Sequence, residues 1–175
     1  MKKLFAVFFV ISIILMYFIS PYLALYQIEQ SVREKNLNKT MYFVDIDRTR
    51  ENLKERMVKE TVLKNTNPNA SAIVNQAKAL VITKSVNYVV DLTFTPENIK
   101  IFLNQMILNK REKTNDVGVA YYYEDMNTFN IMYIINKNEH IIKLSREKLF
   151  FWKITDIVFP LDATLFGQQI ESINQ

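Results

Sequence analysis

Residues 2–26 have the sequence KKLFAVFFVISIILMYFISPYLALY. Two lysines precede an apolar run, and no charged side chain occurs from Leu4 to Ile28. A short basic start before an apolar run is typical of a secretory signal or of a signal anchor. A third interpretation, an apolar helix inside a soluble core, is disfavoured because a chain of this size rarely holds a helix that is apolar all round.

The length of the apolar run bears on whether it is cut off or kept. Leu4–Ile19 holds 16 residues, about 24 Å of helix, and the hydrocarbon core of a bilayer is about 30 Å thick. Extension to Tyr26 gives 23 residues and about 34 Å, which would span. Cleavage after Ser20 or Ala24 would leave an aromatic residue three positions before the cut, where signal peptidase prefers a small one. We favour the interpretation that residues 1–20 are an uncleaved signal anchor. The alternative is a cleaved signal peptide.

The rest of the chain has the size and composition of one domain. We expect residues 21–160 to form a single α+β domain and residues 161–175 a C-terminal tail. The absence of cysteine excludes a lipoprotein anchor. The net charge of +4 comes from basic residues mixed with acidic ones, so we expect no nucleic-acid partner. With only Gly118 and Gly167, the chain has no glycine-rich phosphate loop.

Helix start signals organise the first part of this domain. Four occur: Ser20-Pro21 for a helix ending near Asn36, Asp45 for residues 45–64, Ser71 for a helix through Leu80, and Thr95-Pro96-Glu97 for a fourth. In the third helix, Ile73, Ala77 and Leu80 are expected to face inward. Residues 82–94 fit either a helix or a strand, and we favour a helix.

The character of the sequence changes near residue 117, where β-branched and aromatic residues become frequent. The expected strands are Val117–Glu124, 128–135, His140–Leu144 and Leu149–Phe159, with turns at Asn136–Glu139 and Ser145–Lys148. Such strands predict an antiparallel meander, and helices followed by strands predict an α+β fold. The fold class is therefore an N-terminal transmembrane or signal helix, then about four helices packed on a four-stranded antiparallel meander, in the style of cystatin- and NTF2-like folds.

Several short segments resemble a known family. SPYLALYQI at residues 20–28, VDI at 44–46, RENLK at 50–54, TPE at 95–97 and WKITDI at 152–157 are similar to motifs of the bacterial family catalogued as domain of unknown function 2939. Ile46 and Asp47 depart from its usual aromatic and proline. The resemblance implies an exported or anchored Gram-negative envelope protein with helices on a curved antiparallel sheet. It implies no activity, so no functional residue is carried over.

This resemblance and the basic start together predict a location. Lys2 and Lys3 stay in the cytoplasm by the positive-inside rule. We expect a single-pass inner-membrane protein with its C-terminal domain in the periplasm. After signal cleavage the same domain would be soluble in the periplasm.

Candidate chemistry is sparse. His140 has no cysteine and no second histidine with which to form a dyad or a metal site, so a strand-end histidine is favoured over a general base. Asp45 and Asp47 are interpreted as charges at a helix start, and Glu124 and Asp125 as turn residues. We therefore predict no catalytic, cofactor-binding or metal-binding residue and no cofactor.

The segment Tyr121-Tyr122-Tyr123 is the most suggestive one. In a strand, Tyr121 and Tyr123 face one side and Tyr122 the other. Core packing is the favoured interpretation. The alternative is that Tyr121, Tyr122, Tyr123 and Phe151 form the wall of a ligand cavity or a partner surface.

Three hypotheses for function follow. The first is a non-catalytic binding or accessory module, tethered to the inner membrane, that faces the periplasm and holds a small apolar ligand or docks an envelope protein. The second is a periplasmic enzyme that uses carboxylates such as Asp45, Glu124 or Asp156. The third is a purely structural envelope protein. A closed cavity lined by Tyr and Phe would favour ligand binding. Acidic residues that converge in a pocket would favour an enzyme, and a flat exposed aromatic patch would favour a protein partner.

Overall fold

The computed structural model describes residues 2–109, 118–135 and 137–158. Its helices are α1 (Lys2–Arg33), α2 (Leu37–Tyr42), α3 (Ile46–Asn65), α4 (Ala72–Thr93) and α5 (Pro96–Asn109). Its strands are β1 (Gly118–Asp125), β2 (Thr128–Ile135), β3 (Asn138–Lys148) and β4 (Phe151–Val158). All the helices precede the strands, which confirms the predicted α+β class with an N-terminal apolar helix. The predicted tail 161–175 and loop 110–116 lie outside the described residues.

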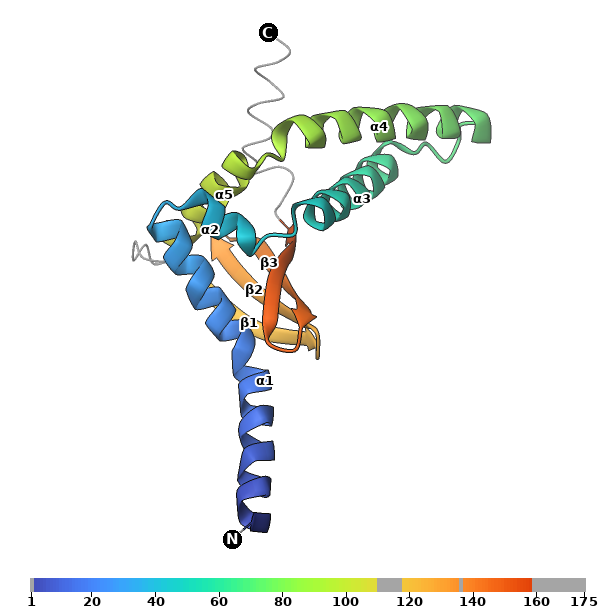
Figure 1. Cartoon of the computed structure of the whole chain (residues 1–175). Coiled ribbons are helices and arrows are strands. Elements are labelled where there is room, and N and C mark those ends of the chain that lie inside the picture. The colour runs from blue at the N-terminus through green and yellow to red at the C-terminus, as the bar shows by residue number, and fades with distance from the viewer. Residues whose placement is uncertain (1, 110–117, 136, 159–175) are drawn as a thin grey trace.

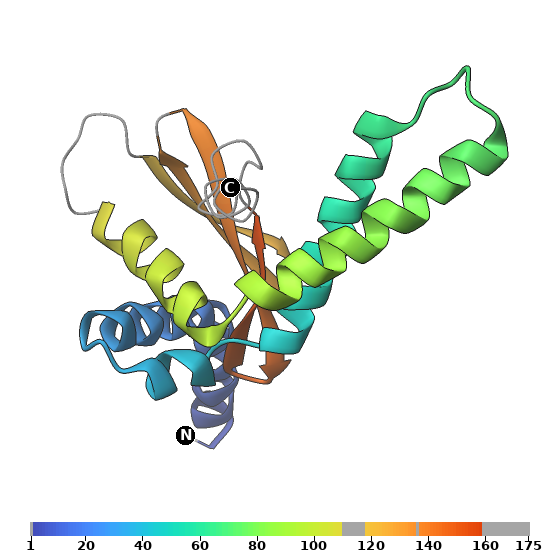
Figure 2. The ribbon, with the colours of Figure 1, turned by 90° about the horizontal axis from the view of Figure 1, so that it is seen from above.

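The strands form one antiparallel sheet in the order β1-β2-β3-β4, as the predicted meander requires. One face of the sheet is apolar because alternate side chains point to it. Its fully buried members are Phe129, Ile131, Tyr133, Leu144, Trp152 and Ile154. In Figure 2, α1, α2 and α5 lie on one side of the sheet, and the hairpin of α3 and α4 extends away on the other.

The predicted turn at Ser145–Lys148 is wrong, because β3 continues to Lys148 and the turn falls at Leu149 and Phe150. Register shifts within the β3–β4 pair break the simple alternation from which a strand is recognised. The hydroxyl groups of Ser145 and Thr155, 2.7 Å apart, satisfy each other between the two strands. A polar stretch that resembles a turn is therefore accommodated in the strand.

The helix α1 passes through Pro21 without a break. The prediction that Ser20 caps a new helix is therefore wrong. Residues 4–19 of α1 stand clear of the rest of the chain over most of their length, as Figure 1 shows, and are largely exposed. The part after Pro21 packs into the core through Ala24, Leu25, Ile28 and Val32.

The remaining helix starts follow the predicted caps. Asp45 accepts a hydrogen bond from the Arg48 amide at 3.1 Å, and Ser71 and Thr95 accept from amides three residues on, at 3.4 and 3.3 Å. These bonds satisfy amides that a helix leaves free at its first turn. A short helix, α2, follows α1 and is capped by Asn36. The helix α4 continues to Thr93, so residues 82–93 are helical, as we favoured.

The α3–α4 hairpin projects from the domain as an arm (Figures 1 and 2). Val86 and Val90 of α4 are buried. The side chains predicted to face inward do the opposite: Ile73 is 78% exposed and Leu80 is 64% exposed, and Ala77 is exposed as well. Apolar residues occur on both faces of α4, so their helical spacing could not identify the buried face.

The outer edge of β4 is covered by the segment that leads into α3. The Ile154 amide donates to the Phe43 carbonyl at 2.7 Å, and the Asp45 amide donates to the Ile154 carbonyl at 2.9 Å. Farther along, Asn52 donates to the Thr155 carbonyl at 2.9 Å and Arg56 to the Ile157 carbonyl at 2.7 Å. The backbone pairs with β4 at a single bridge, between Val44 and Ile154. Beyond that bridge, side chains of α3 bind the carbonyl groups of β4 instead.

Candidate functional site

The first candidate site is the junction where the apolar part of α1 meets the domain. Proline lacks an amide hydrogen, so Pro21 deprives the Tyr17 carbonyl of its usual helical donor. The Ser20 hydroxyl donates to this carbonyl at 2.8 Å. The Ser20 hydroxyl oxygen in turn accepts the indole N–H of Trp152 at 2.8 Å. Because Trp152 is fully buried, this hydrogen bond joins the turn of α1 before Pro21 directly to the core.

Arg146 reinforces this junction from β3. One terminal nitrogen lies 3.3 Å from the Tyr17 carbonyl and 3.2 Å from the Met126 carbonyl, and the other donates to the Leu149 carbonyl. Its guanidinium carbon lies 3.5 Å from the centre of the Tyr17 ring and 4.2 Å from that of Trp152. Arg146 thereby joins α1 to the turns of both the β1–β2 and β3–β4 hairpins, with hydrogen bonds and cation–π contacts.

An aromatic cluster extends the junction along the apolar face of the sheet. The Tyr123 hydroxyl donates to the Phe18 carbonyl of α1 at 2.8 Å, and burial raises the pKa of Tyr123. Its ring centre lies 5.1 Å from that of Phe129. The ring of Tyr22 packs edge-on against Phe129 at 4.9 Å. Aromatic residues of α1, β1 and β2 therefore form one packed cluster.

The four predicted surface residues do not gather at one place. Tyr121 and Tyr123 face α1 and contact Phe129. Tyr122 is on the opposite face and is 41% exposed. Phe151 lies at the other edge of the sheet, where its ring contacts those of Tyr42 and Phe43.

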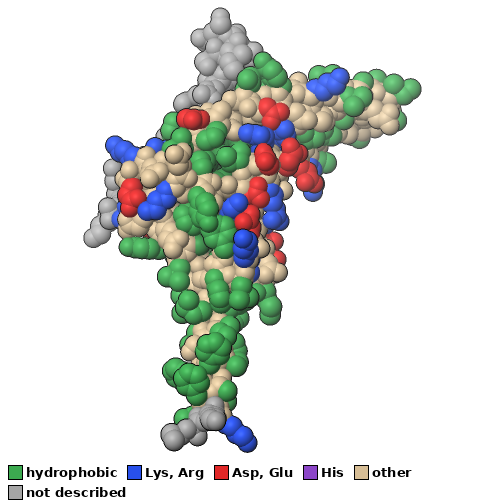
Figure 3. All heavy atoms as spheres, viewed as in Figure 1, with side chains coloured by type: hydrophobic (Ala, Val, Ile, Leu, Met, Phe, Trp, Pro, Cys, Tyr) green, Lys and Arg blue, Asp and Glu red, His purple; other side chains and the backbone are tan. Residues whose placement is uncertain are grey.

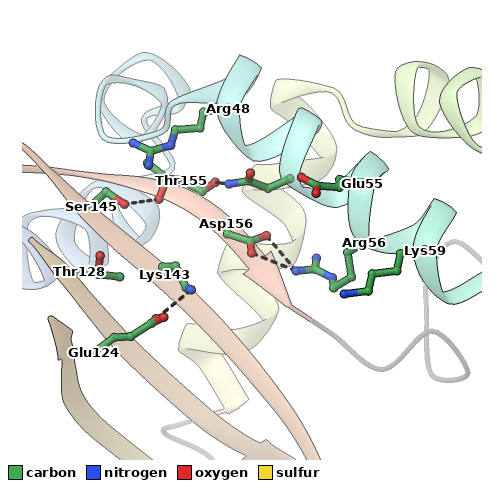
Figure 4. A pocket seen from close by; sticks show the side chains of 11 residues that line it. Arg48, Glu55, Arg56, Lys59, Glu124, Thr128, Lys143, Ser145, Thr155 and Asp156 are labelled. Atoms are coloured by element: carbon green, nitrogen blue, oxygen red, sulfur yellow. Dashed lines mark hydrogen bonds and ion pairs between the residues drawn. The ribbon is translucent and has the colours of Figure 1, made fainter.

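The second candidate site is a polar groove of about 440 Å³ between α3 and the outer face of the sheet (Figure 4). It is lined by Arg48, Asn52, Glu55, Arg56, Lys59, Glu124, Thr128, Lys143, Ser145, Thr155 and Asp156. Arg56 contacts both carboxylate oxygens of Asp156 at 3.0 Å. Lys143 lies 2.8 Å from Glu124. Figure 4 shows these two pairs side by side, with Arg48, Glu55 and Lys59 along the rim formed by α3.

The groove brings together two of the three acids named for an enzyme, Glu124 and Asp156, but Asp45 caps α3 instead. The hydrogen bond from Lys143, helped by one from Asn130, holds the pKa of Glu124 below its ordinary value. A general acid needs a raised pKa instead. Both oxygens of Asp156 accept from one nitrogen of Arg56, whose other terminal nitrogen binds the Ile157 carbonyl. Both acids are therefore arranged as structural charges.

His140 lies directly across from Tyr133 in the β2–β3 register. Burial lowers the pKa of His140, and it raises that of Tyr133. The His140 Nδ1 atom and the Tyr133 hydroxyl are both buried without a hydrogen-bond partner among the described residues. Within the same residues, no group of three or more His, Asp or Glu side chains is placed to hold a metal ion.

The important residues that sequence reasoning missed are Arg146 and Ser20. Arg146 stands in a polar stretch interpreted as a turn, and Ser20 stands before a proline, where a helix cap is common. Each has a partner more than 100 residues away along the chain, Tyr17 for Arg146 and Trp152 for Ser20. No local signal could have identified them.

One of three comparisons with known proteins gives a match. The family model described as "Protein of unknown function (DUF2939)" matches residues 10–101. This range includes most of α1, the arm and the start of α5. No curated protein and no solved structure matches the chain. Among the described helices, α1 is long and apolar enough to cross a membrane, a test that a signal sequence also passes.

Proposed function

The chain belongs to the DUF2939 family of proteins of unknown function, and we propose that it is a non-catalytic binding or accessory module tethered to a membrane by α1. The observation that carries this proposal is the division of one continuous helix into two parts. Its first part is apolar and exposed, and its second part, after Pro21, belongs to the core. Exposed apolar surface of this extent is unfavourable in water and favourable in lipid.

The junction supports a retained anchor rather than a cleaved signal. A cut after Ser20 would remove the Tyr17 carbonyl that Arg146 and Ser20 bind. Either cut would also remove Ser20, which accepts the indole N–H of Trp152. A cut after Ala24 would create a charged amine on Leu25, which is 8% exposed. Burial of an unpaired charge costs several kcal/mol, so either cut would damage the domain.

Lys2 and Lys3 support an orientation with the domain in the periplasm and the start of α1 in the cytoplasm. The inner membrane then holds α1 as a single span. The arm supports a binding role with a protein partner, because the outward face of α4 carries Ile73, Leu80, Val81 and Tyr88, all more than 60% exposed. Apolar side chains gathered on one helix face are typical of a protein contact.

The intact mass of the protein recovered from cell membranes tests the anchor. We expect the full chain, still attached to the membrane after extraction at alkaline pH. A chain that starts after residue 20 would refute it.

The orientation is tested with single cysteines in the cysteine-free chain. Leu63→Cys, at a residue that is 67% exposed on the arm, should react with a membrane-impermeant maleimide in spheroplasts. Lys3→Cys should react only after lysis. The reverse pattern would place the domain in the cytoplasm.

A photo-crosslinking residue in place of Leu80 tests the binding role. We expect a discrete protein adduct in cells that is lost when Ile73→Asp is added, whereas a crosslinker in place of exposed Lys64 on α3 gives none. Equal labelling at both positions would contradict a specific partner at this face.

A further inference from the structure

The length of α1 that is free of the domain is unexpectedly short. Tyr17 already contacts the domain, because its hydroxyl lies 3.3 Å from the Met126 carbonyl and its own carbonyl binds Arg146. The Phe18 carbonyl binds Tyr123. The apolar residues that precede these contacts are Leu4–Met16, 13 residues or about 20 Å of helix. The hydrocarbon core is about 30 Å thick, so the free segment alone is too short by about 10 Å.

A bilayer meets such a shortfall by thinning around the protein, or the protein meets it by placing more apolar surface at the membrane boundary. The second solution requires apolar side chains at the level of Tyr17. The turns of the β1–β2 and β3–β4 hairpins lie at this level, since Arg146 binds Tyr17 together with the Met126 and Leu149 carbonyls. In Figure 1 both turns lie at the end of the sheet that points toward the N-terminus of α1.

The tips of these two turns are apolar and exposed. Met126 is 69% exposed, Leu149 is 59% exposed and Phe150 is 41% exposed. Turn tips in a water-facing domain normally carry small or polar residues. Figure 3 shows hydrophobic side chains along the projecting part of α1 and again over the lower end of the domain, where α1 enters it.

We propose that the two hairpin turns form a second membrane contact, in which Met126, Leu149 and Phe150 lie in the interfacial layer of the bilayer beside α1. The occupant of this surface is the lipid bilayer, and the inference rests on the proposed function that α1 spans it. The interfacial layers add about 5–8 Å on each side of the hydrocarbon core. A domain held wholly outside the bilayer would leave the free segment to cross one of these layers as well as the core. Lowering the turns into that layer removes this extra distance, and local thinning of the bilayer accounts for the remaining shortfall of about 10 Å.

The charged groups of the β3–β4 turn are arranged for such a depth. The guanidinium of Arg146 donates to the carbonyls of Tyr17, Met126 and Leu149 and lies against two rings. The charge of Glu147 is paired with Lys153 at 3.1 Å. Lys148 is exposed beside Leu149, and its long side chain reaches toward lipid phosphates while its stem stays in the apolar layer. These charges keep the turns in the interfacial layer and out of the hydrocarbon core.

The chain has no cysteine, so a single introduced one can carry an environment-sensitive nitrobenzoxadiazole label. Four full-length variants are needed: Met126→Cys and Leu149→Cys at the turns, Val10→Cys within α1, and Leu63→Cys on the arm as the water-exposed control. Each is reconstituted into phosphatidylcholine vesicles with one quarter phosphatidylglycerol. Quenching by phospholipids with a nitroxide near the start of the acyl chain, for the turn labels, or near its end, for the label at residue 10, measures the proximity of each label to the bilayer.

We expect quenching at residues 126 and 149 to be several-fold stronger than at residue 63, and at residue 10 to be strong as well. If residue 10 is quenched while residues 126 and 149 behave as residue 63, the second contact is refuted and the anchor stands. If residue 10 is not quenched either, the proposed anchor fails and the contact fails with it.

A second variant guards against effects of the label. Adding Phe150→Glu to the labelled Met126→Cys chain should shift the label emission to longer wavelength and reduce its quenching, because a charge disfavours insertion of the tip. Adding Tyr88→Glu on the arm, where the side chain is 67% exposed, should leave both unchanged. Equal responses to the two substitutions would overturn the proposal. Unchanged Trp152 fluorescence confirms that each variant is folded.

Discussion

Replacement of Ser20 by alanine is the sharpest test of how α1 is fastened to the domain. The Ser20 hydroxyl accepts the indole N–H of Trp152 and donates to the Tyr17 carbonyl, both at 2.8 Å. Trp152 is fully buried, so its N–H has no access to water in the variant. The Tyr17 carbonyl keeps a second donor in Arg146, at 3.3 Å. The orphaned indole N–H should therefore dominate the loss.

An unsatisfied buried donor costs about 1–3 kcal/mol. Alanine recovers a few tenths of a kcal/mol because its helix propensity exceeds that of serine. The free energy of unfolding should thus fall by about 1–3 kcal/mol. Ser12→Ala is the matched control, because it makes the same change in the same helix. The Ser12 hydroxyl donates only to the Phe8 carbonyl, at an exposed position, so this variant should unfold within about 0.5 kcal/mol of the native chain.

The assay is denaturant unfolding of the full chain in detergent micelles. Trp152 is the only tryptophan, so its fluorescence reports on the domain even where micelles keep the apolar part of α1 helical. Ser20→Thr retains the hydroxyl and should restore most of the lost stability. If Ser20→Ala and Ser12→Ala unfold at the same denaturant concentration, the junction is not held by this hydrogen bond and the argument for a fixed anchor loses its main support.

Three further predictions follow from buried and charged groups. Leu53→Ala on α3 should lower the free energy of unfolding, measured with denaturant, by about 2–5 kcal/mol, because Leu53 is 1% exposed. Leu63→Ala, at a site 67% exposed, should lower it by less than about 0.5 kcal/mol. Similar losses in the two variants would contradict the packing of α3. Burial lowers the pKa of His140 from its ordinary 6.5, so its contribution to stability is complete above that value and is lost as pH falls toward the folded pKa; an NMR titration that gave a pKa above 6.5 would refute this. Lys143→Ala should raise the pKa of Glu124 toward its ordinary value, because the hydrogen bond from Lys143 is the main cause of the lowered pKa. In the native chain, the stability that this carboxylate contributes is present above its unfolded-state pKa and is lost as pH falls through its folded-state pKa. Carbon-13 NMR of the Glu124 carboxyl measures the shift, and an unchanged pKa in Lys143→Ala would show that the ion pair is absent in solution.

Sequence reasoning succeeded where the determining interaction is local. Asp45, Ser71 and Thr95 each accept a hydrogen bond from an amide three residues later, so a short stretch of sequence contains both partners. Phe129, Ile131 and Tyr133 alternate along one short stretch in the same way, and all three are buried on the apolar face of β2. Such local features determine the α+β class and the meander.

Reasoning from sequence failed where the determining partner is distant. The helix passes Pro21 because Ser20, Trp152 and Arg146 satisfy the groups around it, and the last two lie on the final strands. On α4, apolar residues occupy both faces, and contact with α3 decides which face is buried. The polar groove depends on the placement of α3 against β3 and β4. None of these arrangements leaves a pattern within a single segment.

The covered outer edge of β4 has a consequence for the proposed anchoring, in which copies of this protein share one membrane. Tethered molecules diffuse in two dimensions and meet far more often than free ones at the same cellular abundance. An unpaired strand invites a neighbouring chain to extend the sheet. Here Phe43 and Asp45 already occupy the amide and the carbonyl of Ile154, and Asn52 and Arg56 occupy the carbonyls of Thr155 and Ile157. A visiting chain would have to displace these bonds to pair with β4, which disfavours growth of the sheet at this edge.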